Sequence, residues 1–79
     1  MSPTIFRAKG YRFFFFSREE TRPHVHVYCT DGEAKYWLEP QIELARNYNL
    51  NKLQLREIES IVEEHSDELK SAWQRHFRS

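Results

Sequence analysis

The chain of 79 residues lacks several features that mark common protein classes. Its only cysteine, Cys29, has no second cysteine with which to form a disulfide in the chain. Its longest apolar run is the four phenylalanines at positions 13–16, whereas a bilayer-spanning helix needs roughly 20 apolar residues. The first residues contain no apolar segment typical of a signal peptide. We therefore expect a cytoplasmic protein without a membrane segment.

The chain also has no net charge at pH 7. The 12 basic and 12 acidic residues balance at neutral pH, which argues against a strongly basic nucleic-acid-binding domain. The charges are nevertheless distributed unevenly along the chain. Residues 1–30 contain five basic and two acidic side chains, a surplus of three positive charges that residues 31–79 offset.

No nucleotide-binding or zinc-binding signature is present. The sequence has no Walker loop, no glycine-rich dinucleotide turn and no paired-cysteine zinc pattern. A chain this short buries only about 60–65% of the surface that its unfolded form exposes, so it has no room for a deep cavity, and we expect no cofactor. The core must depend on aromatic residues, which make up 15% of the chain.

The first part of the chain has the periodicity of a small antiparallel sheet. Two β-rich runs around Gly10 predict a first hairpin, and two more around Asp31-Gly32 predict a second. The phenylalanines at 13–16 are apolar at consecutive positions, which predicts a strand covered on both faces. A polar loop is expected over 17–22, and the weakly alternating run after Pro40 favours a short edge strand.

The remaining part predicts one long helix. Asn51 and Gln54 form a capping-box pattern before an apolar stripe of 3.6-residue period that runs to about Phe77. We therefore expect an α+β protein with an antiparallel sheet of four to five strands in two hairpins and one long C-terminal helix packed on one face. Residues 1–79 would form a single domain, with the sheet in 1–48 and the helix in 51–78.

A two-residue turn at Asp31-Gly32 assigns the two faces of the second hairpin. Counting outward from that turn pairs His26 with Trp37 and His24 with Glu39. One face then carries the side chains that should pack on the helix: Val25, Val27, Cys29, Ala34, Tyr36 and Leu38. The other face has nothing in the chain left to cover it, and it carries His24, His26, Tyr28, Thr30, Glu33, Lys35, Trp37 and Glu39.

His24 and His26 are the candidate catalytic residues on this uncovered face. Imidazole exchanges protons near neutral pH, so the pair could cleave RNA without a metal, with one ring as base and the other as acid. The candidate substrate-binding residues are cations for phosphate and rings for stacked bases: Arg12, Arg22, Lys35, Tyr28 and Trp37. The alternative interpretation is that polar side chains simply occupy the solvent side of a strand.

The same histidines raise the question of a metal site. A His-x-His strand places two imidazoles on one side, and Glu39 opposite His24 could add a carboxylate. An open sheet face and the lack of a second group of ligands argue against this set. We therefore favour a metal-free site, with His24, His26 and Glu39 as the alternative.

Several segments of the chain resemble a family of short bacterial proteins classed as domain of unknown function 4160. These segments are SPTIFRAKGYRFFFFS, RPHVHVY, AKYWLEP, ELARNYNL and VEEHSDELKSAW. The most specific part is the Pro-His-x-His motif, whose positions are Pro23, His24 and His26, accompanied by Arg12, Lys35 and Trp37. The resemblance implies a second small protein encoded nearby as partner, in pairs that have been proposed as toxin–antitoxin modules.

Two functions are therefore expected from the sequence. In the first, the protein is the toxin of such a pair and acts on RNA, by binding it or by metal-independent histidine-based cleavage. In the second, it is a non-catalytic interaction module, an antitoxin or partner subunit, that docks another protein on its exposed His/Trp face. The expected partners are the cognate protein, RNA, or a second copy of the chain in a homodimer, because a thin core gains from further burial.

Overall fold

Each strand of the sheet pairs with the strand that follows it in the sequence, which gives an antiparallel meander in the order β1-β2-β3-β4-β5. The structure, a computed structural model, describes residues 4–16 and 22–77. The strands are β1 (Thr4–Ala8), β2 (Tyr11–Phe14), β3 (His24–Cys29), β4 (Gly32–Trp37) and β5 (Glu43–Tyr48). Two helices follow, α1 (Lys52–Glu64) and α2 (Ser66–Phe77). The predicted α+β class is confirmed, and β5 is the edge strand that the sequence favoured.

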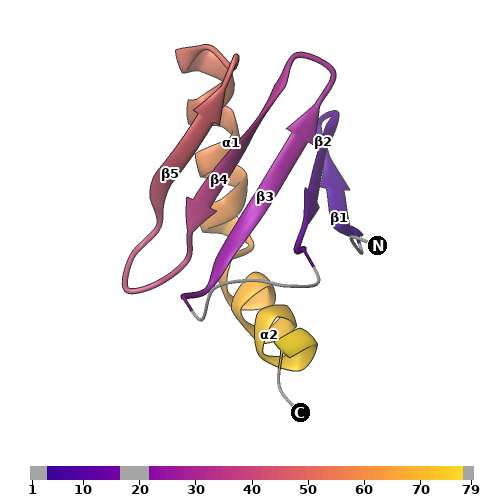
Figure 1. Cartoon of the computed structure of the whole chain (residues 1–79), viewed down its shortest axis with the longest axis vertical. Helices are drawn as coiled ribbons and strands as arrows, with labels where there is room; N and C mark the ends of the chain where they lie inside the picture. Colours follow the sequence, from indigo (N-terminus) through magenta and orange to yellow (C-terminus); the bar gives the residue numbers. More distant parts are fainter. Residues whose placement is uncertain (1–3, 17–21, 78–79) are drawn as a thin grey trace.

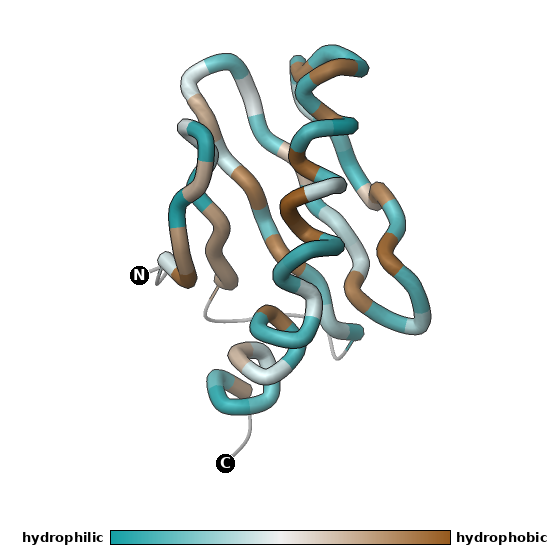
Figure 2. Tube along the Cα trace, turned by 180° about the vertical axis from the view of Figure 1, so that it is seen from behind, coloured by the Kyte–Doolittle hydropathy of each residue, from teal (hydrophilic) through white to brown (hydrophobic). Residues whose placement is uncertain are grey.

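The helix α1 covers one side of the sheet (Figure 1). α1 runs behind the strands, and α2 continues past the ends of β2 and β3, as the opposite view in Figure 2 also shows. The buried residues between the layers include Phe13, Val25, Val27, Tyr36, Leu38, Ile58, Val62 and Leu69. We call the other side of the sheet the open face. No helix within 4–16 and 22–77 has the length and apolarity needed to cross a membrane.

The first hairpin turns at Lys9 and Gly10, which have φ angles of 51° and 85°. Gly10 adopts this left-handed conformation without steric cost, which explains its place between the two β-rich runs. The phenylalanines that follow are buried up to Phe15, as predicted, but Phe16 is partly exposed. Most of the loop expected over 17–22 lies outside the described residues, as does position 78 of the expected helix.

The second hairpin forms where it was predicted, but the predicted register is wrong by two residues. Cys29 pairs with Gly32, so the turn consists of Thr30 and Asp31 and not of Asp31 and Gly32. His26 therefore pairs with Lys35 instead of Trp37, and His24 pairs with Trp37 instead of Glu39. Because side chains alternate with a period of two, a two-residue shift leaves every side chain on its predicted face.

Gly32 explains the shift. A Cβ atom at this position would collide with the carbonyl oxygen of Tyr48 at the end of β5, so the glycine permits close strand approach and does not form the turn. The turn itself is attached to the start of α1. The carbonyl of Asp31 accepts from the Asn49 side chain at 3.0 Å, and its carboxylate accepts from the Gln54 side chain at 2.9 Å.

The helical half differs from the prediction because two helices replace one. The capping box is confirmed, since the Asn51 side chain accepts from the Gln54 backbone N–H and the Gln54 side chain accepts from the Asn51 backbone N–H. The break falls at His65, the C-cap of α1, where φ is −107° and ψ is 19°. The His65 ring packs against Phe6 of β1, with ring centroids 4.6 Å apart. A helix stripe alone contains no signal for this sheet contact.

The pairing of β5 with β4 contains a bulge. Lys35 pairs with Arg46, and the next pair is Tyr36 with Leu44, so Ala45 is left without a partner in the register. The extra residue places Arg46 on the open face together with Glu43, although the two are three positions apart. This bulge determines which side chains of β5 reach the candidate site.

Candidate functional site

The open face presents three rows of side chains that run across the strands. The pairing places Arg12, Tyr28, Glu33 and Tyr48 in the first row. Phe14, His26, Lys35 and Arg46 form the second row, and His24, Trp37 and Glu43 form the third. The face therefore combines aromatic rings and cations, with one carboxylate in the first row and one in the third.

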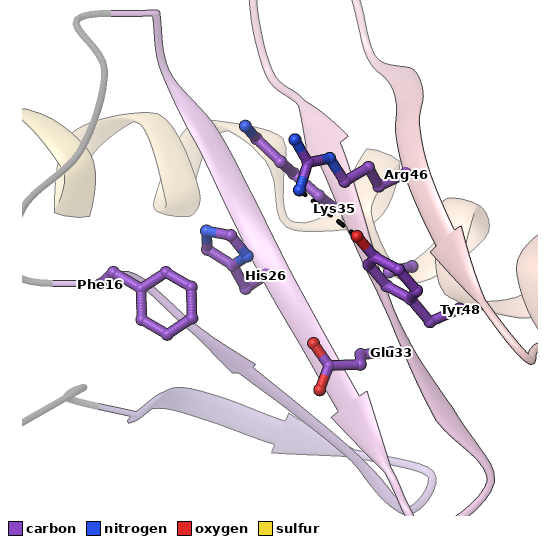
Figure 3. A pocket seen from close by; sticks show the side chains of 7 residues that line it. Phe16, His26, Glu33, Lys35, Arg46 and Tyr48 are labelled. Carbon is purple, nitrogen blue, oxygen red and sulfur yellow. Dashed lines mark hydrogen bonds between the residues drawn. The ribbon is translucent and has the colours of Figure 1, made fainter.

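A shallow pocket of about 540 Å³ lies on this face (Figure 3). We call it the sheet pocket, and it is lined by Phe16, His26, Glu33, Ala34, Lys35, Arg46 and Tyr48. Figure 3 shows Phe16 and His26 on one side, Tyr48 on the other, and the ends of Lys35 and Arg46 together. Arg46 Nη1 donates to the Tyr48 hydroxyl at 3.4 Å.

His26 lies on the open face, as predicted, and its ring is half-buried among other rings. Its centroid is 4.2 Å from that of Phe16 and 5.5 Å from that of Phe14, with which it stacks at an interplanar angle of 25°. These contacts fix the plane of the imidazole. His26 is thus an oriented ring at the wall of the sheet pocket.

His24 corrects the prediction that both histidines lie on an uncovered face, because its side chain is 0% exposed. Its ring centroid lies 4.9 Å from that of Trp73, 5.6 Å from that of Trp37 and 5.1 Å from that of His26. His24 Nδ1 is 2.8 Å from the carbonyl oxygen of Arg22. The physical reason is that α2 extends past the end of the sheet and brings Trp73 against the first residue of β3.

Arg22 packs on the Trp37 ring and forms a hydrogen bond to the segment that follows β4. The Arg22 guanidinium lies 4.1 Å from the centre of the Trp37 ring, and its Nε donates to the carbonyl oxygen of Glu39 at 2.9 Å. It also forms an ion pair of 3.8 Å with Glu43. Lys35 Nζ lies 4.5 Å from the same ring. The Trp37 ring is therefore in contact with two cations of this chain.

Among the other predicted binding residues, only Lys35 reaches the sheet pocket. Arg12 packs over the Phe14 ring at 4.6 Å, and its Nε donates to Thr4 Oγ1 at 2.6 Å. Tyr28 is exposed in the first row, next to Arg12 and Glu33. Arg12, Arg22, Tyr28 and Trp37 thus share the open face without lining the pocket.

Five of the residues that line the pocket were not in the predicted site: Phe16, Glu33, Ala34, Arg46 and Tyr48. Arg46 and Tyr48 were outside the predicted site because the run after Pro40 was predicted only as a short edge strand, with no assignment of its faces, and the sequence contains no clear signal of the bulge in its pairing. Phe16 was assigned to the core as part of its apolar run. Glu33 was placed on the correct face, but a role for it requires the pocket geometry.

Charge is separated between the layers of the molecule. Residues 4–16 and 22–48 contain six basic side chains, Arg7, Lys9, Arg12, Arg22, Lys35 and Arg46, against four acidic ones, Asp31, Glu33, Glu39 and Glu43. The helices contain four basic side chains, Lys52, Arg56, Lys70 and Arg75, against six acidic ones, Glu57, Glu59, Glu63, Glu64, Asp67 and Glu68. The sheet layer is therefore net positive and the helical layer net negative.

The alternative metal set does not assemble. Within the described part of the chain, no three His, Cys, Asp or Glu side chains are grouped so as to hold a metal ion. The corrected register places Trp37, and not Glu39, opposite His24.

These features define a class of small α+β proteins in which helices cover one face of a five-stranded meander and the other face carries an aromatic, cationic pocket. The sequence matches the family described as "Domain of unknown function (DUF4160)" over residues 10–74. The chain belongs to this family, as the resemblance of its motifs implied. No curated protein and no solved structure matches the chain.

Proposed function

We propose that this protein binds single-stranded RNA on the open face of its sheet. The observation that supports the proposal is the combination of exposed rings with adjacent cations on one surface. Phe16, Tyr28 and Tyr48 are 40%, 47% and 54% exposed, and Lys35 and Arg46 are paired between them in the second row.

The physical basis is the way proteins recognise unpaired RNA. Single-stranded bases stack on aromatic side chains, at about 1–3 kcal/mol per base, while cations track the phosphates. In this chain, Tyr48 and the Phe16–His26 pair provide rings on opposite sides of the sheet pocket, and Lys35 and Arg46 provide charge at its end. An antiparallel sheet with one open face leaves room for a strand of RNA to pass.

Binding is better supported than cleavage by the histidine pair. Acid–base catalysis requires both groups within hydrogen-bonding reach of the reacting atoms, and His24 is fully buried behind Trp37 and Trp73. His26 alone lines the pocket. Under this proposal, the protein is the RNA-binding member of the toxin–antitoxin pair expected from the family resemblance, with the small protein encoded nearby as its partner.

The role of the cations can be tested through the salt dependence of RNA binding. We expect the Lys35→Gln/Arg46→Gln double variant to bind a fluorescein-labelled, mixed-sequence single-stranded RNA more weakly than the wild type. The slope of log affinity against log salt should become shallower by about 1.4, because each phosphate contact on a single strand contributes about 0.7. Fluorescence anisotropy at several salt concentrations measures both quantities.

The matched control is the Lys52→Gln/Arg56→Gln variant, which removes two exposed cations from α1. It should keep the wild-type slope. Equal slopes for both double variants would contradict the phosphate-binding role of Lys35 and Arg46. If the wild type binds no RNA at all, the proposal fails, and the interaction-module alternative becomes the better account of the open face.

Cleavage can be tested on the same RNA. We expect end-labelled RNA to remain intact on a denaturing gel after incubation with the wild type in the presence of a chelator, because His24 cannot reach a bound phosphate. If the RNA is cut, and a His26→Gln variant with an unchanged circular dichroism spectrum no longer cuts it, binding without cleavage is wrong.

A further inference from the structure

Among the residues of 4–16 and 22–77 that line the sheet pocket, Glu33 is the only acidic side chain. The residue is exposed, and its carboxylate forms no hydrogen bond or ion pair with any other residue in 4–16 and 22–77. Figure 3 shows its carboxylate away from the ends of Lys35 and Arg46 and turned toward the side that Phe16 and His26 occupy. A carboxylate repels the phosphates of RNA and so weakens binding that does not depend on sequence. Glu33 would therefore favour RNA binding only through a specific contact with a base.

The chemistry of a carboxylate distinguishes the four RNA bases. An ionised carboxylate only accepts hydrogen bonds, and its two oxygens can accept two parallel ones. Guanine presents two adjacent donors on its Watson–Crick edge, N1–H and the N2 amino group. Adenine and cytosine present one amino group beside an acceptor nitrogen, and uracil presents one N–H between two carbonyl oxygens. Guanine is therefore the base whose edge matches a carboxylate at both positions.

The remaining pocket residues fit a guanine nucleotide in this orientation. Glu33 and Tyr48 are opposite each other on β4 and β5, and the Glu33 carboxylate turns toward the side of His26 and Phe16 (Figure 3), so a base that lies between Tyr48 and these rings can direct its edge to the carboxylate. Lys35 lies two residues from Glu33 on the same face of β4, which corresponds to about 7 Å along the strand. A nucleotide can span that separation between its base edge and its phosphate.

We propose that the sheet pocket selects guanine in single-stranded RNA, with Glu33 accepting hydrogen bonds from N1–H and the N2 amino group. The stacking surfaces are Tyr48 on one side and Phe16 with His26 on the other. Lys35 and Arg46 bind the neighbouring phosphate. This inference rests on the proposed RNA-binding function, and it adds to that function the identity of the base.

The experiment compares oligouridines that carry a single guanine, adenine, cytosine or uracil at the central position. We expect the wild type to bind the guanine oligonucleotide about tenfold more tightly than the other three, the scale of one bidentate contact to a base. An oligonucleotide with inosine at that position lacks the N2 amino group and should bind with intermediate affinity. Fluorescence anisotropy at one fixed salt concentration gives all five affinities.

The decisive variant is Glu33→Gln, which keeps the shape of the side chain but replaces one acceptor oxygen with a donor. It should reduce the preference for guanine to within about twofold while raising the affinity for the other oligonucleotides, because a negative charge is removed. The matched control, Glu43→Gln, removes the same charge from the third row of the open face, outside the pocket. It should keep the preference for guanine.

The outcomes separate this inference from the function on which it rests. If every oligonucleotide binds equally well to the wild type, guanine selection is wrong and RNA binding stands. The same conclusion follows if Glu33→Gln and Glu43→Gln change all affinities by the same factor, since Glu33 then acts only through its charge. If no oligonucleotide binds, both proposals fail.

Discussion

Gly32 connects the second hairpin to the last strand. It begins β4, and the carbonyl of Tyr48 approaches it so closely that no Cβ fits between them. Tyr48 is also a wall of the sheet pocket. The lack of a side chain at this one residue therefore bears on both the stability of the sheet edge and the geometry of the candidate site.

We expect Gly32→Ala to lower the free energy of unfolding by about 3 kcal/mol, the upper part of the range for overpacking, because the atom that must move belongs to the backbone. Urea denaturation followed by circular dichroism measures the loss. Gly10→Ala is the control, since open space surrounds that position and only its φ of 85° is unfavourable, at about 1 kcal/mol. A smaller loss at Gly32 than at Gly10 would contradict the predicted collision.

The burial of His24 could not be predicted from the strand in which it lies. The alternation of β3 placed it on the face opposite Val25, and that assignment follows from local geometry. Its burial depends on Trp73, which is 49 positions later in the sequence. The periodic stripe of the helix identified Trp73 as apolar but contained no information on how far the helix extends beyond the sheet.

At the scale of elements, two tyrosine hydroxyls join the sheet to α1. Tyr11 of β2 donates to the Glu57 carboxylate at 2.8 Å, and Tyr36 of β4 donates to the Leu55 carbonyl oxygen at 3.0 Å. Burial, followed by the hydrogen bond to Glu57 and its charge, raises the pKa of Tyr11 from 10.0 to about 12. Burial and the charge of Glu59 raise the pKa of Tyr36 to about 12 as well.

These pKa values predict alkaline unfolding. Between pH 10.0 and about pH 12 the unfolded chain releases both phenolic protons while the folded chain retains them. The free energy of unfolding is therefore fully maintained below pH 10.0 and should fall as pH rises through this window. Urea midpoints measured from neutral pH to pH 12 test the slope. A Tyr11→Phe/Tyr36→Phe variant should show a flatter dependence, and an equal slope in both proteins would contradict the assignment.

The pairing of elements was predictable in part. The hydrophobic pattern located both hairpins and the faces of the second hairpin, because one buried face fixes the alternation. The Asp-Gly signal placed its turn one residue too late, which shifts the register by two, because Gly32 is required by β5, a strand that the turn rule does not consider. The faces of the strand after Pro40 were not predicted, and the bulge at Ala45, which places Arg46 and Tyr48 on the open face, depends on the pairing of two strands.

At the scale of the whole molecule, the sequence predicted which layers exist and which face stays open. Apolar positions with two different periods required a helix layer on one side of a sheet. The break at His65 and the path of α2 past the sheet depend on contacts with Phe6, Phe15 and His24, which are distant in the sequence. The candidate site was therefore predicted as a face but not as a pocket.

The separation of charge between the layers has a consequence for how a ligand approaches this protein. The extents of the molecule are 37 × 26 × 19 Å, and at physiological ionic strength the Debye length is about 8 Å. An anion near the open face is thus screened from most of the acidic side chains of the helices on the far side. To such an anion the described residues of the open face present the cations Arg12, Arg22, Lys35 and Arg46 and the carboxylates Glu33 and Glu43, although the 12 positive and 12 negative charges of the chain sum to zero.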